Sequence, residues 1–251
     1  IGPLRAAYTP GVAEFVVSHT GGAGLGSFKQ AFVEADAHPD VGSARDRIRF
    51  AIPGNGPHTI SIAGLSLLQS SGRLEIDGST QTGYVANTAT IGTNAQLPID
   101  ILGAKLALTG SPDSLIRGLV LRGPSALLSI GPGAVESCFI GVSQDGLSLS
   151  TTVGNTAQLN CSGCRVGGST LAQRNLIGAD ANLAIIGVHL AASGSVAEGN
   201  LIGLRRDGLT RLLAPAAPIS SNVSSGIGVG AGATSGVQIR NNTIGGFVEG
   251  I

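Results

Sequence analysis

The segment Asn-Leu-Ile-Gly occurs twice in this chain, at residues 175–178 and 200–203. Related segments flank it, with Phe-Ile-Gly-Val from Phe139 and Asn-Thr-Ile-Gly-Gly from Asn242. A short apolar unit that returns along a chain cannot bury its own apolar face, so copies of it must stack on one another. The repeat therefore favours a solenoid over a sandwich of long strands.

Short apolar alternations with a period of two, separated by Gly, Pro or Asp-Gly turns, run along most of the chain and predict strands. They are Ile48/Phe50, Ile60/Ile62, Leu74/Ile76, Ile99/Ile101, Leu106/Leu108, Leu119/Leu121, Leu128/Ile130, Val188/Leu190, Ile227/Val229 and Val237/Ile239. The apolar triplets return about every 20 to 25 residues where nothing is inserted. Together these patterns predict an all-β fold, a right-handed parallel β-helix.

Asn175, Asn200 and Asn242 are predicted to occupy the same corner on successive coils of the helix. Asn tolerates the left-handed backbone of a tight bend, and stacked Asn side chains can hydrogen-bond to one another in a ladder. The stretch 204–222 reads as an insertion that carries Arg205, Arg206 and Arg211. Insertions in solenoids form loops on one face, which is often the binding face.

The segment Gly26–Pro39 is the one convincing helix pattern, with apolar residues at helical spacing. Ser27 and Gln30 have the spacing of a capping box, and Phe28 and Phe32 would cover the exposed edge of the first coil. We therefore divide the chain into an N-terminal strand and capping helix, residues 1–46, and β-helix coils, residues 47–251. The chain stops as a new repeat begins, so we expect the coils to continue beyond residue 251.

Composition limits the partners of the chain. Its 15 acidic and 15 basic residues cancel, which leaves no basic surface for nucleic acid. No apolar run is long enough to predict a transmembrane segment. Aromatic residues make up 3% of the chain, too few for a glycan groove built on stacking rings, although a polar groove stays open.

Cys161 and Cys164 have CxxC spacing among Gly and Ser residues, which indicates structural thiols or a small loop disulfide. Cys138 is the third cysteine. No second Cys or His pair accompanies them, so no metal site is predicted. No cofactor is expected either.

Several longer segments resemble large secreted bacterial proteins built of right-handed parallel β-helix repeats. Residues 26–36, 47–62 and 74–84 are similar to the N-terminal block of those proteins, and residues 166–178, 198–208 and 241–246 to their repeat units. The resemblance covers almost the whole chain and implies a pectate-lyase-like solenoid that is exported from the cell. It implies no single activity, because this fold serves polysaccharide lyases, glycoside hydrolases, phage tailspikes, adhesins and surface-layer components.

A glycoside hydrolase needs two carboxylates about 5 to 10 Å apart. Asp145, Asp180 and Asp207 are the candidates, because each follows an Ile-Gly pair and acids on stacked coils lie close together. Asp145 and Asp207 each precede a Gly at the same position of the repeat. Asp followed by Gly is also the composition of an ordinary turn.

The sequence leaves two main functions open. The first is a structural or adhesive protein, secreted or at the cell surface, with no catalysis in this segment. The second is a polysaccharide lyase or glycoside hydrolase acting on an extracellular glycan, and a module that binds glycan without cleaving it is a further possibility. Partners would be a glycan, other surface proteins, or further copies of the chain stacked end to end.

Overall fold

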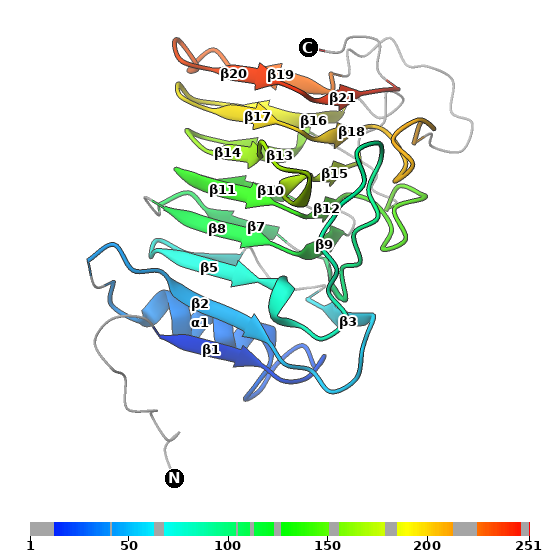
Figure 1. Ribbon diagram of the computed structural model, residues 1–251. Coiled ribbons are helices and arrows are strands. Elements are labelled where there is room, and N and C mark those ends of the chain that lie inside the picture. Colours follow the sequence, from blue (N-terminus) through cyan, green and yellow to red (C-terminus); the bar gives the residue numbers. More distant parts are fainter. Residues whose placement is uncertain are drawn as a thin grey trace.

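The computed structural model describes residues 13–40, 42–62, 68–103, 105–110, 113–122, 127–150, 156–178, 185–212, 225–246 and 251. Its strands form three parallel sheets that stack coil upon coil along one axis (Figure 1). One α-helix and two short 3-10 helices, Gly78–Thr80 and Leu171–Gln173, complete the regular structure of these ranges. The prediction of an all-β right-handed parallel β-helix is confirmed.

Each complete coil contributes one strand to each sheet, and every pairing joins consecutive coils in parallel. Sheet 1 contains β1 (Glu14–Val17), β2 (Asp46–Phe50), β5 (Leu74–Asp77), β8 (Ser114–Arg117), β11 (Gly133–Glu136), β14 (Arg165–Gly167), β17 (Val196–Glu198) and β20 (Gln238–Arg240). Sheet 2 contains β3 (His58–Ser61), β6 (Ile99–Leu102), β9 (Leu119–Arg122), β12 (Phe139–Ile140), β15 (Leu176–Ile177), β18 (Leu201–Ile202) and β21 (Thr243–Ile244). Sheet 3 contains β4 (Leu68–Gln69), β7 (Lys105–Leu108), β10 (Leu127–Ile130), β13 (Thr156–Cys161), β16 (Ile185–Leu190) and β19 (Ile227–Val229).

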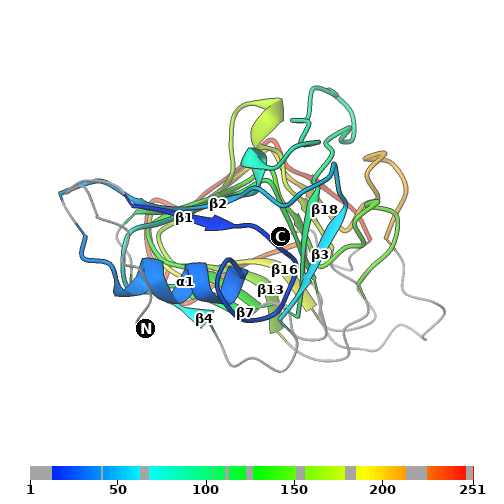
Figure 2. The same cartoon turned by 90° about the horizontal axis from the view of Figure 1, so that it is seen from below.

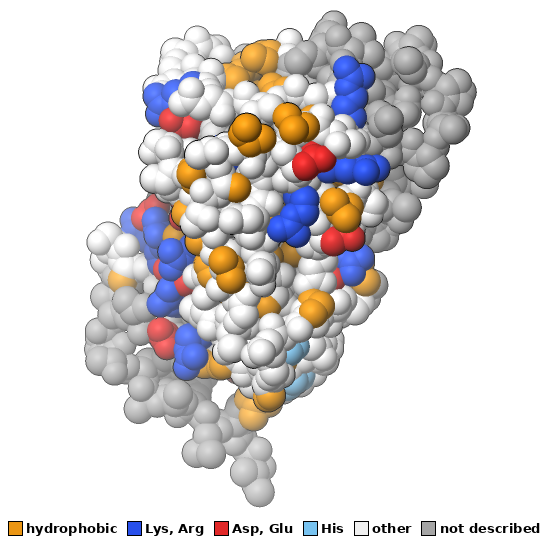
Figure 3. Space-filling model, turned by 45° about the vertical axis from the view of Figure 1, so that its right-hand side comes forward, with side chains coloured by type: hydrophobic (Ala, Val, Ile, Leu, Met, Phe, Trp, Pro, Cys, Tyr) orange, Lys and Arg blue, Asp and Glu red, His pale blue; other side chains and the backbone are white. Residues whose placement is uncertain are grey.

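Aliphatic side chains fill the interior in stacks, because in-register pairing places each inward residue over its equivalent. Charged side chains lie on the outside, as the space-filling view shows (Figure 3). One interior stack, on sheet 1, consists of Ile48, Ile76, Ile116, Val135, Val166 and Ala197, all of them buried. Burying each such side chain stabilises the fold by about 1.5–3 kcal/mol relative to leaving it exposed.

The register shows which sheet each triplet belongs to. Val166 pairs with Val135 below it and with Ala197 above it, so the triplets at 165–167 and 175–178 belong to one coil and lie in different sheets. Paired residues on successive coils are 25 positions apart at Leu176 and Leu201, as the spacing predicted, and 31 apart at Val135 and Val166. Ile202 pairs directly with Ile244, so the predicted insertion loops out between two neighbouring coils, and its residues 213–222 lie outside the described ranges.

The helix α1 (Phe28–Ala37) lies across the open end of the first coil (Figure 2). Phe28 and Phe32 are buried beneath it, and the Phe28 ring stacks on Phe50 with 6.0 Å between centroids. The Ser27 hydroxyl accepts a hydrogen bond from the Gln30 backbone N–H at 3.2 Å. The Gln30 side chain donates instead to Glu34, so only half of the predicted capping box forms.

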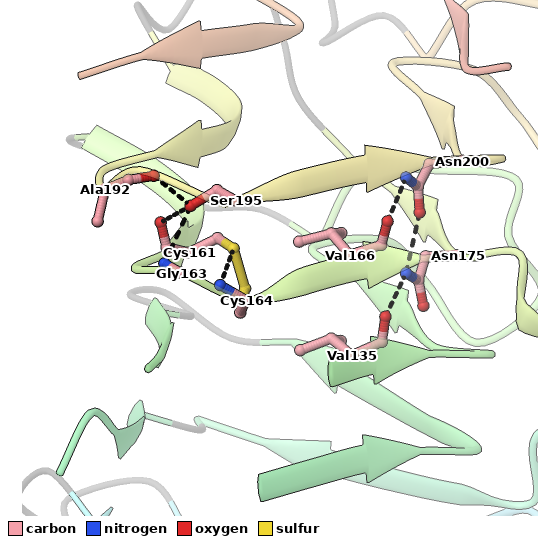
Figure 4. The surroundings of a disulfide bond; sticks show 9 residues. All are labelled: Val135, Cys161, Gly163, Cys164, Val166, Asn175, Ala192, Ser195 and Asn200. Atoms are coloured by element: carbon pink, nitrogen blue, oxygen red, sulfur yellow. Dashed lines mark hydrogen bonds between the residues drawn. A yellow bond between two sulfur atoms is a disulfide. The ribbon is translucent and has the colours of Figure 1, made fainter. Parts of the chain in front are cut away.

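The three predicted corner asparagines hydrogen-bond in a continuous ladder, of which Figure 4 shows Asn175 and Asn200. Asn175 Nδ2 donates to Asn200 Oδ1 at 2.9 Å, and Asn200 Nδ2 donates to Asn242 Oδ1 at 2.8 Å. Each amide also donates to the backbone carbonyl that precedes the corner on the coil below, at Val135, Val166 and Ala197. The side-chain oxygens of Asn175 and Asn242 accept from the backbone N–H groups of Cys138 and Asn200, so the ladder satisfies backbone groups where the chain turns between sheets 1 and 2.

Replacing Asn200 with Ala removes its hydrogen bonds to the Val166 carbonyl, to Asn175 and to Asn242, all from a fully buried side chain. We expect a loss of about 2–4 kcal/mol in the free energy of unfolding, measured by urea denaturation. The matched control is Asn160→Ala, because Asn160 lies on the outer face of β13 and its side chain bonds His189; it should cost less than about 1 kcal/mol. Equal losses in the two variants would contradict the structural role of the ladder.

Candidate functional site

Asp145 and Asp207 lie in two hairpin loops of the same design, residues 141–150 and 203–212. The first follows β12 and is closed by an antiparallel bridge between Val142 and Leu149. The second follows β18 and is closed in the same way between Leu204 and Arg211. The two loops project from sheet 2, which places both candidate acids on one side of the solenoid.

Both carboxylates are acceptors in their own turns. Asp145 Oδ1 accepts from the Ser143 hydroxyl and, at 3.0 Å, from the Leu147 backbone N–H. Asp207 Oδ1 accepts from the backbone N–H of Leu209 at 2.9 Å and of Thr210 at 2.8 Å, and its Oδ2 accepts from the Thr210 hydroxyl at 2.6 Å. These bonds are those of ordinary Asp-Gly turns.

The turn hydrogen bonds hold the pKa of both groups below its usual range. The Ser143 hydroxyl is the largest cause at Asp145, and the Thr210 hydroxyl at Asp207. A glycosidase acid needs a raised pKa, so that it holds a proton to donate at neutral pH. These bonds and pKa directions favour turn roles for Asp145 and Asp207, and the catalytic pair stays a prediction. Asp180, the third candidate, lies outside the described residues.

The outer face of sheet 1 carries carboxylates paired with arginines from neighbouring coils. The centre is Asp77 at the end of β5, which is fully buried and accepts from Arg47 of β2, Arg117 of β8 and Ser79. Burial raises the pKa of Asp77, but the hydrogen bonds from Arg117, Ser79 and Arg47 outweigh it, so the pKa is lowered overall. The residue is held ionised as a structural counterion.

The same pairing recurs along the solenoid. Further pairs on sheet 1 are Glu14–Arg49, Glu75–Arg117, Glu136–Arg165 and Glu198–Arg240. On sheet 2, the buried Asp100 accepts from Arg122 Nη2 at 2.6 Å and from the Thr59 hydroxyl at 3.0 Å. Arginines on one coil thus neutralise acids on the next, and the ion pairs join the coils from outside.

Within the described ranges, every carboxylate has a hydrogen-bond or ion-pair partner in the protein. The set is Glu14, Glu34, Asp36, Asp40, Asp46, Glu75, Asp77, Asp100, Asp113, Glu136, Asp145, Glu198 and Asp207. The same ranges contain no group of three or more His, Cys, Asp or Glu residues that could hold a metal ion. No described acid is therefore left unpaired for acid–base work.

The cysteines have structural surroundings. Cys161 and Cys164 form a disulfide at the corner between sheets 3 and 1 (Figure 4). The Ser195 hydroxyl from the next coil accepts from the Gly163 backbone N–H at 3.0 Å and donates to the Ala192 carbonyl at 2.7 Å. Cys138 is free and buried, and desolvation raises the pKa of its thiol to about 12, which leaves it unreactive.

The segment between β5 and β6 forms a feature that the sequence did not reveal. Its residues 84–97, which we name the strap, climb the outside of the solenoid toward the 203–212 hairpin (Figure 1). Arg174 Nη1 donates to the strap carbonyls of Ala89, Thr90 and Gly92, the last at 2.6 Å. The Thr93 backbone N–H donates to the Arg206 carbonyl at 2.7 Å. Hydrogen bonds therefore tie the strap to coils far along the chain.

The strap covers a second apolar cluster on the outer face of sheet 2. Its buried members are Ala95, Leu97, Val120, Phe139, Val142, Leu176, Leu201 and Leu212. Val120, Phe139, Leu176 and Leu201 stack in register, one coil above the other. The sequence did contain one signal for this cover. In Phe-Ile and Leu-Ile two adjacent residues are apolar, so both faces of the strand are apolar and both are expected to be covered.

Comparisons with protein-family models, with curated protein sequences and with solved structures found no match for this chain. The resemblance to secreted bacterial β-helix proteins accordingly stays a prediction. Among the described residues, no helix has the length and apolar character needed to cross a lipid bilayer.

Replacing Asp77 with Asn removes the fully buried counterion that Arg47 and Arg117 share, and leaves Glu75 as the second carboxylate that pairs with both. We expect the free energy of unfolding to fall by about 2–3 kcal/mol at neutral pH. This is the low end for breaking a buried ion pair, because both arginines are partly exposed. The folded pKa lies below the ordinary value of 3.8, so this stabilisation is present above that value and lost as the pH falls through the folded pKa.

The measurement is the free energy of unfolding against pH for the wild type and for Asp77→Asn, whose curve should be flatter in that acidic window. Asp113→Asn is the control, because Asp113 is 48% exposed and pairs with Arg45; it should cost less than about 1 kcal/mol. If Asp77→Asn and the wild type show the same stability and the same acid dependence, the assignment of Asp77 as a structural counterion is wrong.

Replacing Arg174 with Ala removes the three hydrogen bonds that its Nη1 atom donates to strap carbonyls. Hydrogen exchange at strap amides such as Thr93 should accelerate by at least about tenfold, while amides of β14 and β15 keep their protection. Arg205→Ala is the control, since no hydrogen bond joins the Arg205 side chain to the strap in the described ranges. Uniform acceleration throughout the coils would show that Arg174 supports the whole solenoid rather than the strap.

Proposed function

We propose that this chain is a structural or adhesive β-helix protein, secreted or displayed at the cell surface, without catalysis in this segment. The observation that carries the proposal is the state of its acids. Every described carboxylate is bound to an arginine, a histidine, a backbone N–H or a side-chain donor within the protein. A rigid rod held together in this way suits spanning distance or presenting a surface.

Two features support an extracellular setting. The Cys161–Cys164 disulfide is of the kind that persists in oxidising compartments. The resemblance to secreted bacterial repeat proteins points in the same direction. Glycans or other surface proteins are the partners that such a rod would meet.

End-to-end stacking is the third kind of contact to expect. The helix α1 covers the first coil, so head-to-tail contact at that end would require the cap to move. At the opposite end, β19, β20 and β21 are the last strands of the described ranges, and further coils would pair there.

The decisive experiment is a search for polysaccharide cleavage. Purified protein is incubated with a panel of neutral and acidic polysaccharides, with and without calcium, and new reducing ends and unsaturated products are measured. We expect none above a heat-denatured control, and no difference between the wild type, Asp145→Asn and Asp207→Asn. Release of either product by the wild type, abolished by one of these substitutions, would establish the lyase or hydrolase alternative instead.

A further inference from the structure

Three exposed aliphatic side chains from distant parts of the sequence converge on one face of the solenoid. Ile91 on the strap is 68% exposed, Leu147 on the first hairpin is 46% exposed, and Leu209 on the second hairpin is 76% exposed. The backbones beside them are in contact. Gly92 and Gly208 approach too closely to leave room for a side-chain carbon at either position, and the Arg206 N–H donates to the Gly146 carbonyl at 2.9 Å.

Four arginines surround the same contact, at positions 174, 205, 206 and 211 (Figure 3 shows this face). In the described ranges none of them hydrogen-bonds or forms an ion pair with a carboxylate, whereas the arginines on the outer faces of sheets 1 and 2 do. Arg174 and Arg206 donate to strap carbonyls, and Arg205 and Arg211 are exposed. The described acids nearby, Asp145 and Asp207, have lowered pKa values and interact electrostatically with Arg206 and Arg205. Four arginines against two carboxylates leave an excess of positive charge on the described part of this face.

We propose that this face docks onto a lipid bilayer that bears anionic headgroups, with Ile91, Leu147 and Leu209 entering the interfacial region. Aliphatic side chains on loop tips, flanked by cations, provide the two contributions of peripheral membrane binding: buried apolar area and attraction to anionic lipid. The side chains of Ile91, Leu147 and Leu209 project from loops. A lipid bilayer is fluid and can accommodate them without a surface of complementary shape. The inference goes beyond the proposed function and is tested independently of it.

The alternatives fit the face less well. A polysaccharide would favour aromatic rings over branched aliphatic tips, and the described strap and hairpins present no exposed ring. A second copy docked symmetrically would bring arginines against arginines, which costs free energy. An anionic bilayer attracts the arginines through its headgroups and can also bury the exposed aliphatic side chains.

The test is co-sedimentation of the purified chain with vesicles of phosphatidylcholine and phosphatidylglycerol in equal parts, compared with vesicles of phosphatidylcholine alone. We expect binding to the mixed vesicles that weakens as salt is raised. Arg205→Gln and Arg211→Gln should each weaken it about fivefold, and Leu209→Asn roughly tenfold. All three side chains are exposed, and circular dichroism checks that each variant keeps the fold.

Matched controls lie on the opposite end of the molecule. Leu25→Asn removes an 85% exposed leucine, and Lys29→Gln removes a cation of the capping helix; neither should change vesicle binding. The proposal is overturned by absent binding to mixed vesicles, by equal binding to neutral vesicles, or by face variants that behave like the controls. A dimer in sedimentation velocity that Leu209→Asn dissociates, without vesicle binding, would assign the face to a second copy.

Discussion

The parallel register between coils is the constraint on which the rest of this molecule depends. Because each residue lies over its equivalent on the coil below, a single favourable contact is repeated along the axis. Ile48 begins an aliphatic stack that continues through Ala197 to Ile239, and Asn175 begins an amide ladder that ends at Asn242. A shift of one residue would turn the interior stacks outward and break the ladder at the same time.

The same register explains the electrostatics of the surface. Acids and arginines that lie on neighbouring coils come within hydrogen-bonding distance, as Asp77 does with Arg47 and Arg117. A fully buried carboxylate is unfavourable by itself, and two guanidinium partners offset the loss of hydration. The acids are thereby committed to joining coils, which agrees with the proposal that this segment supports a surface rather than a reaction.

Much of the architecture could be predicted from the sequence. Stacked positions favour the same residue types on successive coils, so similar segments recur along the chain. The capping helix, the period-two strands and the corner at Asn175 and Asn200 all follow from local patterns. The sequence was less informative where position depends on distant contacts. Triplets of sheets 1 and 2 look alike, so the pattern did not distinguish the two sheets. The strand at Ser114–Arg117 was missed because it has one inward aliphatic residue, Ile116.

The strap shows what pattern alone cannot supply. Its residues contain Gly, Asn and Thr in the proportions of an ordinary loop, and the carbonyls that Arg174 binds have no signature in the sequence. The candidate acids illustrate the same limit. The position of Asp145 in the repeat is compatible with a catalytic carboxylate and equally with an Asp-Gly turn. The hydrogen bonds from Ser143 and Leu147 favour the turn role, and cleavage assays test the other.

A double-mutant cycle on Asn175 and Asn200 tests the central claim of coil-on-coil register most directly. The free energies of unfolding of Asn175→Ala, Asn200→Ala and the double variant are compared with that of the wild type. The account predicts a coupling energy of about 1–2 kcal/mol between the two sites, because one amide donates to the other. Losses that add to within about 0.5 kcal/mol would contradict it, because additivity is the behaviour of residues that do not touch.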